Sequence, residues 1–584
     1  MKTISIKNNN SANKNILIAL GALIGAATFL LIYGLSPLNP LNDSFVVSGY
    51  LEKDVAQHYA GWRLFRTSPW QFPLGVGENM EFPYGGAVSY SDSIPLFAIF
   101  FKLFRCILPD TFQYFGIFVL LCFVLQGVFA ALLISLFSHS YLVCSIAACF
   151  FTFSPVMIER AFRHCALTAH FLIIAGLYYY FKNRTGWTVK NVFPFFIINC
   201  LAITIHPYFL PFTFAIMFAF CLEIAIKYKK YLLNIMSIFA SILSTLLVGF
   251  SIGAFHIKGS LGELGYGYFN MNLNSYFNPT SKNIPSWSKI FSQRPLLLGQ
   301  VEGFNYLGCG IIVLSIVGAV LVVAKHRKLI FSFAAQHFGL LFSAVCLTLF
   351  AVGDWVSYGG LKLFRFPLSQ FLIDNVLSIF RANGRFGNFL YYLLFLFAIY
   401  MLVTLVNTKG ACLILTAFLM LQLYDISGAV LYKHNYFFSA TAPTDNPQWV
   451  APVAQHPFWE DAVQRADGVV EMESENGSIF GNGLIDIASL CGKYGKYMNS
   501  TFAARTSGEL RREFLASEKQ KIADGTAETL LYVVEEVNYF SHLIQENQYQ
   551  AFEVDGQLVV IKACFSKEDI QRYTDLGNFK QIVL

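Results

Sequence analysis

The chain has 584 residues, of which 55% are hydrophobic, 17% aromatic and only 13% charged. Soluble domains carry about 25% charged residues, so this composition excludes an ordinary soluble protein and indicates a polytopic membrane protein with many aromatic side chains at the lipid interface. The net charge of +6 is small for this length, and no basic tract resembles a nucleic-acid-binding surface, so we expect no nucleic-acid partner.

Apolar runs alternate with short polar connectors as far as residue 431. The first run, 16–35, is long enough to cross a bilayer, which takes about 20 residues. It has no small-residue cleavage site, so we expect a retained anchor. Ten further runs predict spans at 113–137, 141–157, 165–181, 192–205, 208–226, 232–255, 304–324, 329–352, 386–407 and 411–431.

The segment 94–108 (IPLFAIFFKLFRCIL) decides the topology, because it is short and carries Lys102 and Arg105. Counting it as a span would place three basic connectors outside, against the positive-inside rule. As a helix lying in the outer interface, it leaves all of them in the cytoplasm. We therefore predict about eleven spans, with the N-terminus inside and the C-terminus outside. The basic connectors are 182–190, 227–230 and 325–328.

This topology places on the outer face the polar segments whose side chains could take part in catalysis or binding. They are the large first loop 36–112, then 158–164, 256–303 and 353–385, together with the turn His206-Pro207-Tyr208. The cytoplasmic connectors are short and mostly basic. We expect the functional residues to meet on the outer side.

Polar residues become frequent from about residue 440, where we predict a change of domain. Helical patterns alternate there with strand-like runs, which favours a small extracytoplasmic α/β domain at 440–584 after a transmembrane domain at 1–435. It contains no glycine-rich phosphate loop and no nucleophile elbow. The helical patterns are 457–466 and 507–522, and the strand-like runs are 468–472, 529–535 and 558–563.

Asp54 lies in the first outer loop, in the stretch EKDVAQHYAGWRLFR (52–66). A carboxylate held at the membrane surface could act as a base toward a lipid-linked substrate. Three neighbours could help to bind that substrate: Gln57, His58 and Tyr59. The same spacing also fits an amphipathic surface helix without a ligand.

Asp92 is the second acidic candidate of this loop, in YGGAVSYSDSIPLF (84–97). It precedes Ser93-Ile94-Pro95, which reads as the start of the interfacial helix. Asp92 could therefore serve in catalysis, or it could be an N-cap that satisfies free backbone amides.

Arginine and histidine side chains gather in SPVMIERAFRHCALTAH (154–170). Arg160, Arg163 and His164 have helical spacing and could share one face of a helix. His170 follows six residues after His164 and is a further binding candidate. Arginine suits bidentate binding of phosphate, so an anionic ligand would explain positive charge on the outer side. The alternatives are an interfacial anchor or an ion pair with Glu159.

Three more motifs lie at outer helix ends. His206 stands before a helix-breaking proline and could reach a ligand or cap a turn. The glycine-rich segment 299–310 (GQVEGFNYLGCG) could bind a ligand or be a flexible helix start. The segment 380–388 (FRANGRFGN) reads as a phosphate site or as a lipid headgroup anchor. The binding candidates in these two segments are Gln300, Glu302, Asn305, Arg381 and Arg385.

Together these motifs resemble the GT-C superfamily of membrane glycosyltransferases, and most closely a bacterial family of GT-C-like membrane proteins. The resemblance covers about residues 1–430 and leaves the C-terminal domain unexplained. It rests on D-x-x-Q-H-Y-x-G-W (54–62), F-P-x-G (82–85), D-S-I-P-L (92–96), R-x-x-x-H-x-x-L-x-x-H (160–170), H-P-Y (206–208), G-Q-x-E-G-F-N-Y-L-G (299–308) and R-x-x-G-R-F (381–386).

The resemblance implies a GT-C-like helical fold and transfer of a hexose or pentose from a polyprenyl-phosphate donor to an extracytoplasmic glycan, lipid or protein. Asp54 would be the catalytic carboxylate and Asp92 a second acidic or metal-adjacent residue. The donor phosphates would be held by Arg160, His164, Arg381 and Arg385. An acceptor motif of the WWDYG type is absent, which argues against peptide glycosylation of that kind.

The expected location is the bacterial cytoplasmic membrane, with membrane lipid as a further partner and a cell-envelope polysaccharide as one acceptor class. No CxxC or Cys/His spacing predicts a metal site, and the motifs leave open whether a divalent cation takes part. A transporter or flippase of lipid-linked glycans is the alternative. It would require ionisable residues near the bilayer centre and paired broken helices, and few mid-span charges occur.

Overall fold

The computed structural model describes residues 13–47, 53–256, 265–282, 284–325, 327–438, 454–472, 483–501 and 507–583. Contacts divide the chain into two compact units. Unit 1 consists of Met1–Asn39, Phe115–Leu247 and Leu261–Thr441, and unit 2 of Pro40–Tyr114, Val248–Ser260 and Ala442–Leu584. The sequence predicted that the first loop, 36–112, belongs to the transmembrane domain 1–435. In the structure, nearly all of this loop belongs to the same compact unit as the C-terminal segment.

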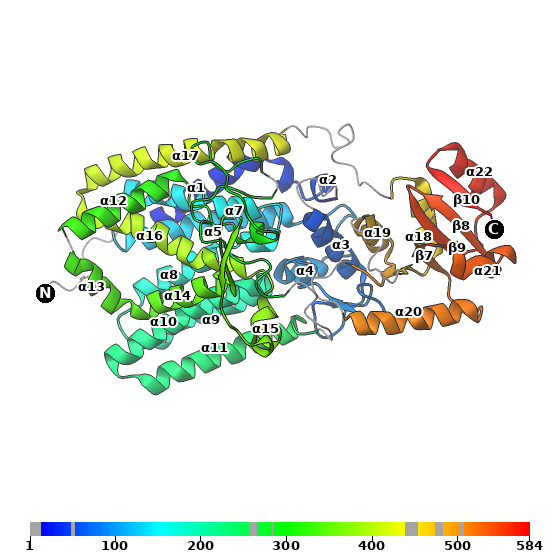
Figure 1. The fold of residues 1–584 in the computed structure, drawn as a ribbon, viewed down its shortest axis with the longest axis horizontal. Coiled ribbons are helices and arrows are strands. Elements are labelled where there is room, and N and C mark those ends of the chain that lie inside the picture. Colours follow the sequence, from blue (N-terminus) through cyan, green and yellow to red (C-terminus); the bar gives the residue numbers. More distant parts are fainter. Residues whose placement is uncertain are drawn as a thin grey trace. The chain divides into compact units, whose positions relative to one another are not determined.

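Each of the eleven predicted apolar runs corresponds to an α-helix of 12 to 31 residues. Figure 1 shows α8, α10 and α14 side by side in unit 1, where α10 contacts both of the others. The last residues of α11 belong to unit 2. The helices are α1 (Lys14–Tyr33), α5 (Phe115–Ser135), α6 (Tyr141–Thr152), α8 (Phe171–Lys182), α9 (Val189–Ile205), α10 (Leu210–Tyr228), α11 (Tyr231–Ser251), α12 (Cys309–Lys325), α14 (Phe338–Val352), α16 (Asn388–Leu405) and α17 (Thr408–Phe438).

Seven helical segments of the described residues are long and apolar enough to cross a membrane. The chain is therefore a multi-pass membrane protein. Four further apolar helices are shorter: Tyr141–Thr152, Val189–Ile205, Cys309–Val323 and Phe338–Val352. The seven segments are Lys14–Tyr33, Phe115–Ser135, Cys165–Lys182, Pro207–Tyr228, Tyr231–Ser251, Asn383–Leu405 and Thr408–Phe438.

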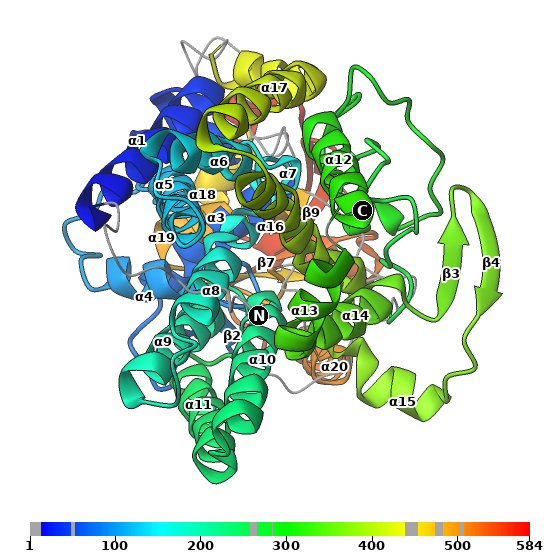
Figure 2. The same ribbon diagram turned by 90° about the vertical axis from the view of Figure 1, so that its left-hand side faces the viewer.

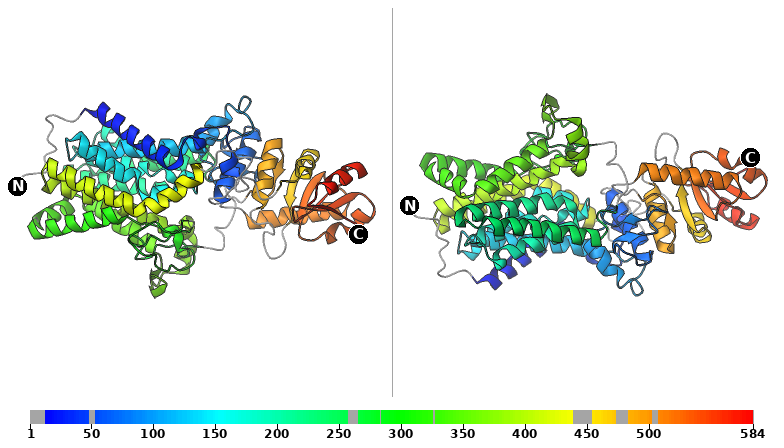
Figure 3. Two further views of the ribbon diagram at one scale, coloured as in Figure 1. Left: turned by 90° about the horizontal axis from the view of Figure 1, so that it is seen from above. Right: turned by 90° about the horizontal axis from the view of Figure 1, so that it is seen from below.

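Glycines bring α1 and α5 into close contact, and the two helices run along each other in Figure 3. A Cβ atom at Gly25 would lie 2.1 Å from the Phe123 carbonyl oxygen, and one at Gly127 would lie 2.2 Å from that of Gly21. Small residues at such positions let helix backbones approach in a membrane, where van der Waals packing drives association. The first helix is thereby anchored to the bundle.

Short segments between the long helices of unit 1 carry most of the candidate site. Figure 2 also shows the hairpin of β3 (Trp355–Tyr358) and β4 (Leu361–Arg365), with α15 (Gln370–Asn375), at the rim of this unit. The remaining segments are α7 (Pro155–Arg160), η2 (Cys165–Thr168), η3 (Pro207–Phe209), η4 (Gln300–Gly303), α13 (Arg327–Gln336), η5 (Leu377–Phe380) and η6 (Asn383–Gly387).

Unit 2 begins with Pro40–Tyr114, which is most of the predicted first loop. Its main helix, α3 (Lys53–Thr67), packs against α19 (Gly483–Tyr494). The ambiguous segment 94–108 forms only an eight-residue helix, α4 (Pro95–Lys102), which is too short to cross a bilayer. The other elements are α2 (Ser44–Val47), β1 (Val76–Gly77) and β2 (Gly86–Ala87).

The predicted C-terminal α/β domain is confirmed. Six strands form a mixed sheet in the order β10-β8-β9-β7-β5-β6, in which β5 pairs in parallel with β6 and β7 and the other pairs are antiparallel. The strands are β5 (Gly468–Glu471), β6 (Tyr497–Met498), β7 (Leu530–Val534), β8 (Tyr549–Val554), β9 (Gln557–Lys562) and β10 (Phe579–Ile582).

Helices cover both faces of this sheet, because alternate strand residues point to opposite sides. Tyr532 and Ala551 pack with Phe514 of α20 (Gly508–Ala523) in one core cluster. On the other face, the Phe552 ring lies 5.2 Å from that of Phe458 in α18 (Pro457–Arg465), which also contacts Tyr573. Tyr573 belongs to α22 (Lys567–Asp575), and the remaining helix is α21 (Ser541–Gln545).

Candidate functional site

Glu302 is the centre of a buried charge cluster in unit 1. Its carboxylate accepts hydrogen bonds from Arg160 Nη1 at 2.8 Å, Arg163 Nη2 at 3.0 Å and Arg385 Nη2 at 2.8 Å. Arg160 also donates to the Glu302 backbone carbonyl at 2.9 Å. His164 Nε2 lies 3.7 Å from Glu302 Oε1. Four residues predicted from three separate motifs, together with His164, therefore meet at one point.

The short helix α7 and the turn after it present two of these arginines. The helix starts with Pro155 at its first position, where the missing amide costs nothing, and it ends at Arg160. Arg163 Nη1 donates to Glu159 Oε1 at 2.8 Å, and Glu159 Oε2 accepts from Trp287 Nε1 at 2.9 Å. Glu159 thus fixes the orientation of Arg163, while the other edge of that guanidinium meets Glu302.

Two glycines let η4 and η6 come close enough to bring Glu302 and Arg385 together. A Cβ atom at Gly384 would lie 2.7 Å from Gly303 Cα, and one at Gly303 would lie 2.8 Å from the Asn270 carbonyl oxygen. Asn305 Nδ2 donates to the Gly303 carbonyl at 2.9 Å. Asn305 therefore holds the cluster's backbone, a role that the motif alone did not reveal.

Gln300 likewise ties chain segments together. Its Nε2 donates to Asn270 Oδ1 at 2.7 Å and to Ser357 Oγ at 2.6 Å, and its Oε1 accepts from Asn272 Nδ2 at 2.8 Å. These bonds satisfy both ends of a buried amide. The structure thus places Gln300 beside the cluster as a support for η4.

Among the described residues named for this cluster, positively charged groups outnumber carboxylates. Burial raises the pKa of Glu302, but the positive charges of Arg160, Arg385 and Arg163 outweigh burial and hold that pKa well below its ordinary value. Lys433, near the end of α17, donates to the carbonyls of Glu159 at 3.4 Å and Ala161 at 3.0 Å. Three guanidinium groups and one ammonium group thus accompany two carboxylates, an arrangement suited to an anionic ligand.

The His206-Pro207-Tyr208 turn supports Arg385. His206 Nδ1 accepts a hydrogen bond from the Tyr208 amide at 3.2 Å, so the histidine caps η3. Capping a turn was one of the two predicted roles of His206. The Tyr208 hydroxyl accepts from the Ala382 amide at 2.8 Å, and the Arg385 guanidinium lies 4.9 Å from the Tyr208 ring centroid. Tyr208 therefore positions Arg385 through a cation–π contact.

His170 and Arg381 lie away from the Glu302 carboxylate. His170 Nδ1 is 2.9 Å from the Tyr392 hydroxyl, inside the helices. The Arg381 side chain is exposed, and its guanidinium lies 5.5 Å from the Phe269 ring centroid. Within the described residues, neither side chain forms an ion pair with Glu302.

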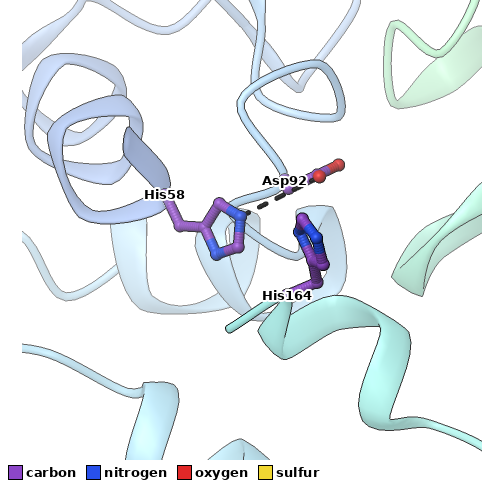
Figure 4. A group of neighbouring side chains, drawn as sticks. All are labelled: His58, Asp92 and His164. Atoms are coloured by element: carbon purple, nitrogen blue, oxygen red, sulfur yellow. Dashed lines mark ion pairs between the residues drawn. The ribbon is translucent and has the colours of Figure 1, made fainter. Parts of the chain in front are cut away.

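Unit 2 holds the acidic candidates. His58 on α3 is buried, and its Nε2 lies 3.9 Å from Asp92 Oδ2, as Figure 4 shows. Asp92 has a φ of 54°, in the left-handed region, and the N-cap of α4 is Ile94. Asp92 is therefore not the predicted N-cap; it is a half-buried carboxylate turned toward a histidine.

Gly61 allows the Asp92 loop to approach α3. A Cβ atom at Gly61 would lie 2.2 Å from Ser91 Oγ. Ser93 Oγ donates to the His58 carbonyl at 2.6 Å and is 2.8 Å from Ser91 Oγ. This serine pair fastens the loop to the helix on both sides of Asp92. The glycine of the D-x-x-Q-H-Y-x-G-W motif thus has a steric explanation.

Asp54 lies in the first turn of α3 and is half-buried, as is Gln57. Tyr59 is buried and donates to Asp43 Oδ2 at 2.9 Å. Burial raises the pKa of Asp43, and the Tyr59 hydrogen bond opposes that rise. Tyr59 is therefore engaged in the packing of the loop, whereas Asp54 keeps partial access to solvent.

Four residues of the Glu302 cluster were not among the predicted site residues: Glu159, Trp287, Tyr208 and Lys433. Glu159 and Tyr208 lie inside predicted motifs, so the motifs contained a signal for them. Trp287 is a fully buried tryptophan in a polar segment, and Lys433 is a lysine buried beside an apolar run. A lysine directly after an apolar run, as at Lys433, is a sequence feature that could have indicated this residue.

Comparison with known families decides where the chain belongs. The model described as "Domain of unknown function (DUF6311)" matches residues 22–427. The chain belongs to the DUF6311 family. A second model, described as "DUF6311 C-terminal domain", matches residues 458–563. No match was found among curated proteins.

The DUF6311 match encloses every candidate residue described above, from Asp54 to Arg385. The C-terminal match covers most of the six-stranded sheet domain. Neither description names a reaction, so the GT-C resemblance of this DUF6311 protein stays a prediction.

Proposed function

We propose that this protein is a GT-C-type glycosyltransferase, which moves a sugar from a polyprenyl-phosphate donor to an extracytoplasmic glycan, lipid or protein. The observation that carries the proposal is the meeting of Arg160, Arg163 and Arg385 around Glu302. Guanidinium groups fixed by a carboxylate are preorganised for a phosphate group and need little rearrangement to stabilise the charge of a departing phosphate.

The reaction also needs a base. A carboxylate of the first loop, Asp54 or Asp92, would take the proton of the acceptor hydroxyl, whose oxygen then bonds to the anomeric carbon of the sugar. The bond between that carbon and the phosphate oxygen breaks, and the polyprenyl phosphate leaves with the electron pair. The nearby His58 favours Asp92 for this role, because an imidazole beside a carboxylate can accept or return a proton.

The three chain segments that make up unit 2 support the proposed topology. They form one compact unit, so we place all of them on the same side of the membrane. An even number of crossings must then lie between residues 114 and 248, and again between 260 and 442. The six helices α5, α6, α8, α9, α10 and α11, and the four helices α12, α14, α16 and α17, meet this condition.

With α1 added, these helices would make the predicted eleven spans, and an odd number of crossings would put unit 2 and the N-terminus on different sides of the membrane. The positive-inside rule then places unit 2 outside the cytoplasmic membrane of a bacterium. A donor delivered by a polyprenyl chain and an acceptor in the cell envelope both fit that location.

Binding of undecaprenyl phosphate to the protein in lipid nanodiscs tests the phosphate site. Arg385→Gln should weaken binding about tenfold or more, because it removes a charge-assisted contact to phosphate. Arg365→Gln is the matched control in the same unit, since Arg365 is half exposed and pairs with Asp354. Equal affinity in wild type and Arg385→Gln, with the control unchanged, would reject the site.

A second measurement separates transfer from transport. Asp92→Asn should keep undecaprenyl phosphate binding and abolish release of polyprenyl phosphate from a sugar-loaded donor, with Asp54→Asn tested alongside. A flippase would instead move the intact donor between leaflets without breaking the glycosyl–phosphate bond. Intact donor in the opposite leaflet, with no free polyprenyl phosphate, would favour the flippase and overturn the transferase.

A further inference from the structure

A basic pocket lies inside unit 2, apart from the residues assigned to the proposed transfer. It has a volume of about 430 Å³ and is lined by α3, by the connector after α4 and by α19. Arg63, Arg66 and Arg105 contribute guanidinium groups, and Asp110 is the acidic residue of its lining. Three arginines at one cavity would attract an anion.

Two of these arginines are fixed by backbone oxygens, which are neutral. Arg66 donates to the carbonyls of Pro109 at 2.8 Å and Leu108 at 2.7 Å. Arg105 donates to the Ser68 carbonyl at 2.6 Å. Carbonyl acceptors orient a guanidinium without cancelling its charge, so the positive potential of the pocket is retained.

The third arginine is fixed by α19. Arg63 Nη1 donates to Ser489 Oγ at 3.0 Å, and a Cβ atom at Gly492 would lie 2.5 Å from Arg63 Cβ. Within the described residues, Arg63, Arg66 and Arg105 form no ion pair with a carboxylate. Lys493, also at the pocket, differs because it pairs with Glu460. The close packing of α19 on α3 therefore builds a wall beside a guanidinium group that a neutral hydroxyl holds in place.

An exposed apolar stripe adjoins the pocket. On the segment 96–107, five large apolar side chains are exposed at helical spacing, while Phe97 and Phe101 face inward, with ring centroids 5.8 Å and 5.5 Å from that of Tyr114. Arg105 and Cys106 of the pocket lie within this same segment. The exposed side chains are Leu96, Phe100, Leu103, Phe104 and Ile107.

The chain keeps this segment near the membrane. Asp110 precedes Phe115, the first residue of a candidate span, by five residues, which reach about 18 Å at most. Segments with an apolar face and basic side chains lie in the lipid interface, where cationic groups meet the phosphates of headgroups. The short distance to the span and the apolar stripe therefore fit a segment that lies in the lipid interface, with the basic pocket beside it.

We propose that this pocket binds the phosphate group of an anionic membrane lipid. The guanidinium groups of Arg63 and Arg105 contact the phosphate oxygens, and the stripe 96–107 packs against the lipid's acyl chains. The site does not depend on the proposed glycosyl transfer. It anchors unit 2 to the membrane surface through a bound lipid.

Cys106, an exposed thiol of the pocket lining, reports occupancy directly. The full-length protein is placed in phosphatidylcholine nanodiscs with or without phosphatidic acid, and alkylation of each cysteine is followed by mass spectrometry. Phosphatidic acid should slow alkylation of Cys106 about tenfold. Cys564, an exposed thiol of the same unit outside the pocket, should react at an unchanged rate. Equal Cys106 rates in the two membranes would overturn the proposal.

Variants assign the effect to the arginines. Arg63→Gln with Arg105→Gln should abolish the protection of Cys106, whereas Arg63→Lys with Arg105→Lys should retain most of it. Arg572→Gln, a surface arginine of α22 in the same unit, is the matched control. Cys491 is a buried thiol of the same unit, and its continued resistance to alkylation shows that the glutamine variant is folded. Protection that persists in a folded glutamine variant would overturn the proposal.

Soluble glycerol phosphate distinguishes a lipid from a free phosphate. Added to phosphatidylcholine nanodiscs at the same concentration as the phosphatidic acid, it should leave Cys106 reactive, because it lacks the acyl chains that the stripe contacts. Protection equal to that by phosphatidic acid would overturn the lipid as occupant.

Discussion

At the residue scale, the carboxylate of Glu302 holds three arginine side chains together. Glu302 bonds to three guanidinium groups in a buried site, so its loss removes the carboxylate that these three like charges share. Removing one partner of a buried ion pair costs about 3–5 kcal/mol. We expect Glu302→Gln to lower the thermal unfolding midpoint in detergent clearly, although glutamine keeps the shape of the side chain.

Asp374→Asn is the control for this change, because Asp374 is an exposed carboxylate of the same unit. A surface substitution of that kind changes stability by about 0.5 kcal/mol or less. An unfolding midpoint of Glu302→Gln equal to that of Asp374→Asn would show that the arginines do not depend on Glu302.

The same residue predicts a pH dependence. The pKa of Glu302 in the folded protein lies well below its ordinary value of 4.5. Its ionised form therefore stabilises the fold fully above pH 4.5, and the contribution is lost as pH falls through the folded pKa. The difference in midpoint between wild type and Glu302→Gln should be constant from neutral pH to about pH 5 and shrink in stronger acid.

The sequence predicted which residues meet in this cluster better than it predicted their contacts. Arg160, Arg163 and Arg385 were expected to bind phosphate, and their charge and spacing made that visible. Glu302 was expected to bind a ligand beside a flexible helix start, yet it holds the arginines. Its bond to Arg160 joins positions 142 residues apart, and no local pattern encodes such a partner. His206 illustrates the same limit, because its contact with the Tyr208 amide makes it a cap.

At the element scale, the position of the Asp92 loop on α3 depends on the absence of a side chain at Gly61. Alanine is the better helix former by about 1 kcal/mol, but overpacking a tight contact costs about 1–3 kcal/mol. The added Cβ would lie 2.2 Å from Ser91 Oγ and 2.4 Å from Ser91 Cβ, so the steric effect should win. We expect Gly61→Ala to raise hydrogen exchange in residues 88–97 and to lower the unfolding midpoint.

Gly508→Ala provides the contrast within the same unit. Its new Cβ would meet nothing closer than Arg512 Nη1 at 3.6 Å, so only the helix preference of alanine remains. This variant should be as stable as wild type or more so. If Gly61→Ala behaved like Gly508→Ala, the serine pair would not be what sets the place of Asp92.

Elements were predictable where local pattern dominates. Long apolar runs and the strand-like runs at 468–472, 529–535 and 558–563 matched helices and strands, because burial alone specifies them. Strand β8 was missed, since YQAFEV mixes polar and apolar residues and gains its place by pairing with β9 and β10. Helix α17 continues to Phe438, past the predicted end at 431, because Lys433 finds backbone acceptors inside the protein.

At the scale of the whole molecule, unit 2 draws on three separate stretches of the chain. The linear order suggested a loop within the membrane part and an independent C-terminal domain, but α3 packs against α19, and Gly492 permits that contact. Composition reveals a change of character along the chain and carries no information on which distant segments pack together. Packing depends on surface shape, which a single sequence does not display.

The number of membrane crossings is the property on which the site's location depends, and one connector can decide it. Seven helical segments meet a length of 18 residues, and four helices are shorter. Counting all eleven places the connector between α8 and α9 in the cytoplasm. Counting only the seven long segments omits α6 and α9 and places that connector outside. Both counts leave unit 2 outside and the connector between α10 and α11 inside.

Thr185→Cys therefore distinguishes the two topologies without removing a positive charge from the connector. Thr185 is exposed between α8 and α9. In intact cells, an impermeant maleimide should label native Cys564 and should leave Thr185→Cys unlabelled until the membrane is permeabilised, because the basic connector is held inside. Tyr231→Cys, at the start of α11, is inside under both counts and controls for leakage. Labelling of Thr185→Cys in intact cells, with Tyr231→Cys protected, would reduce the crossings to seven.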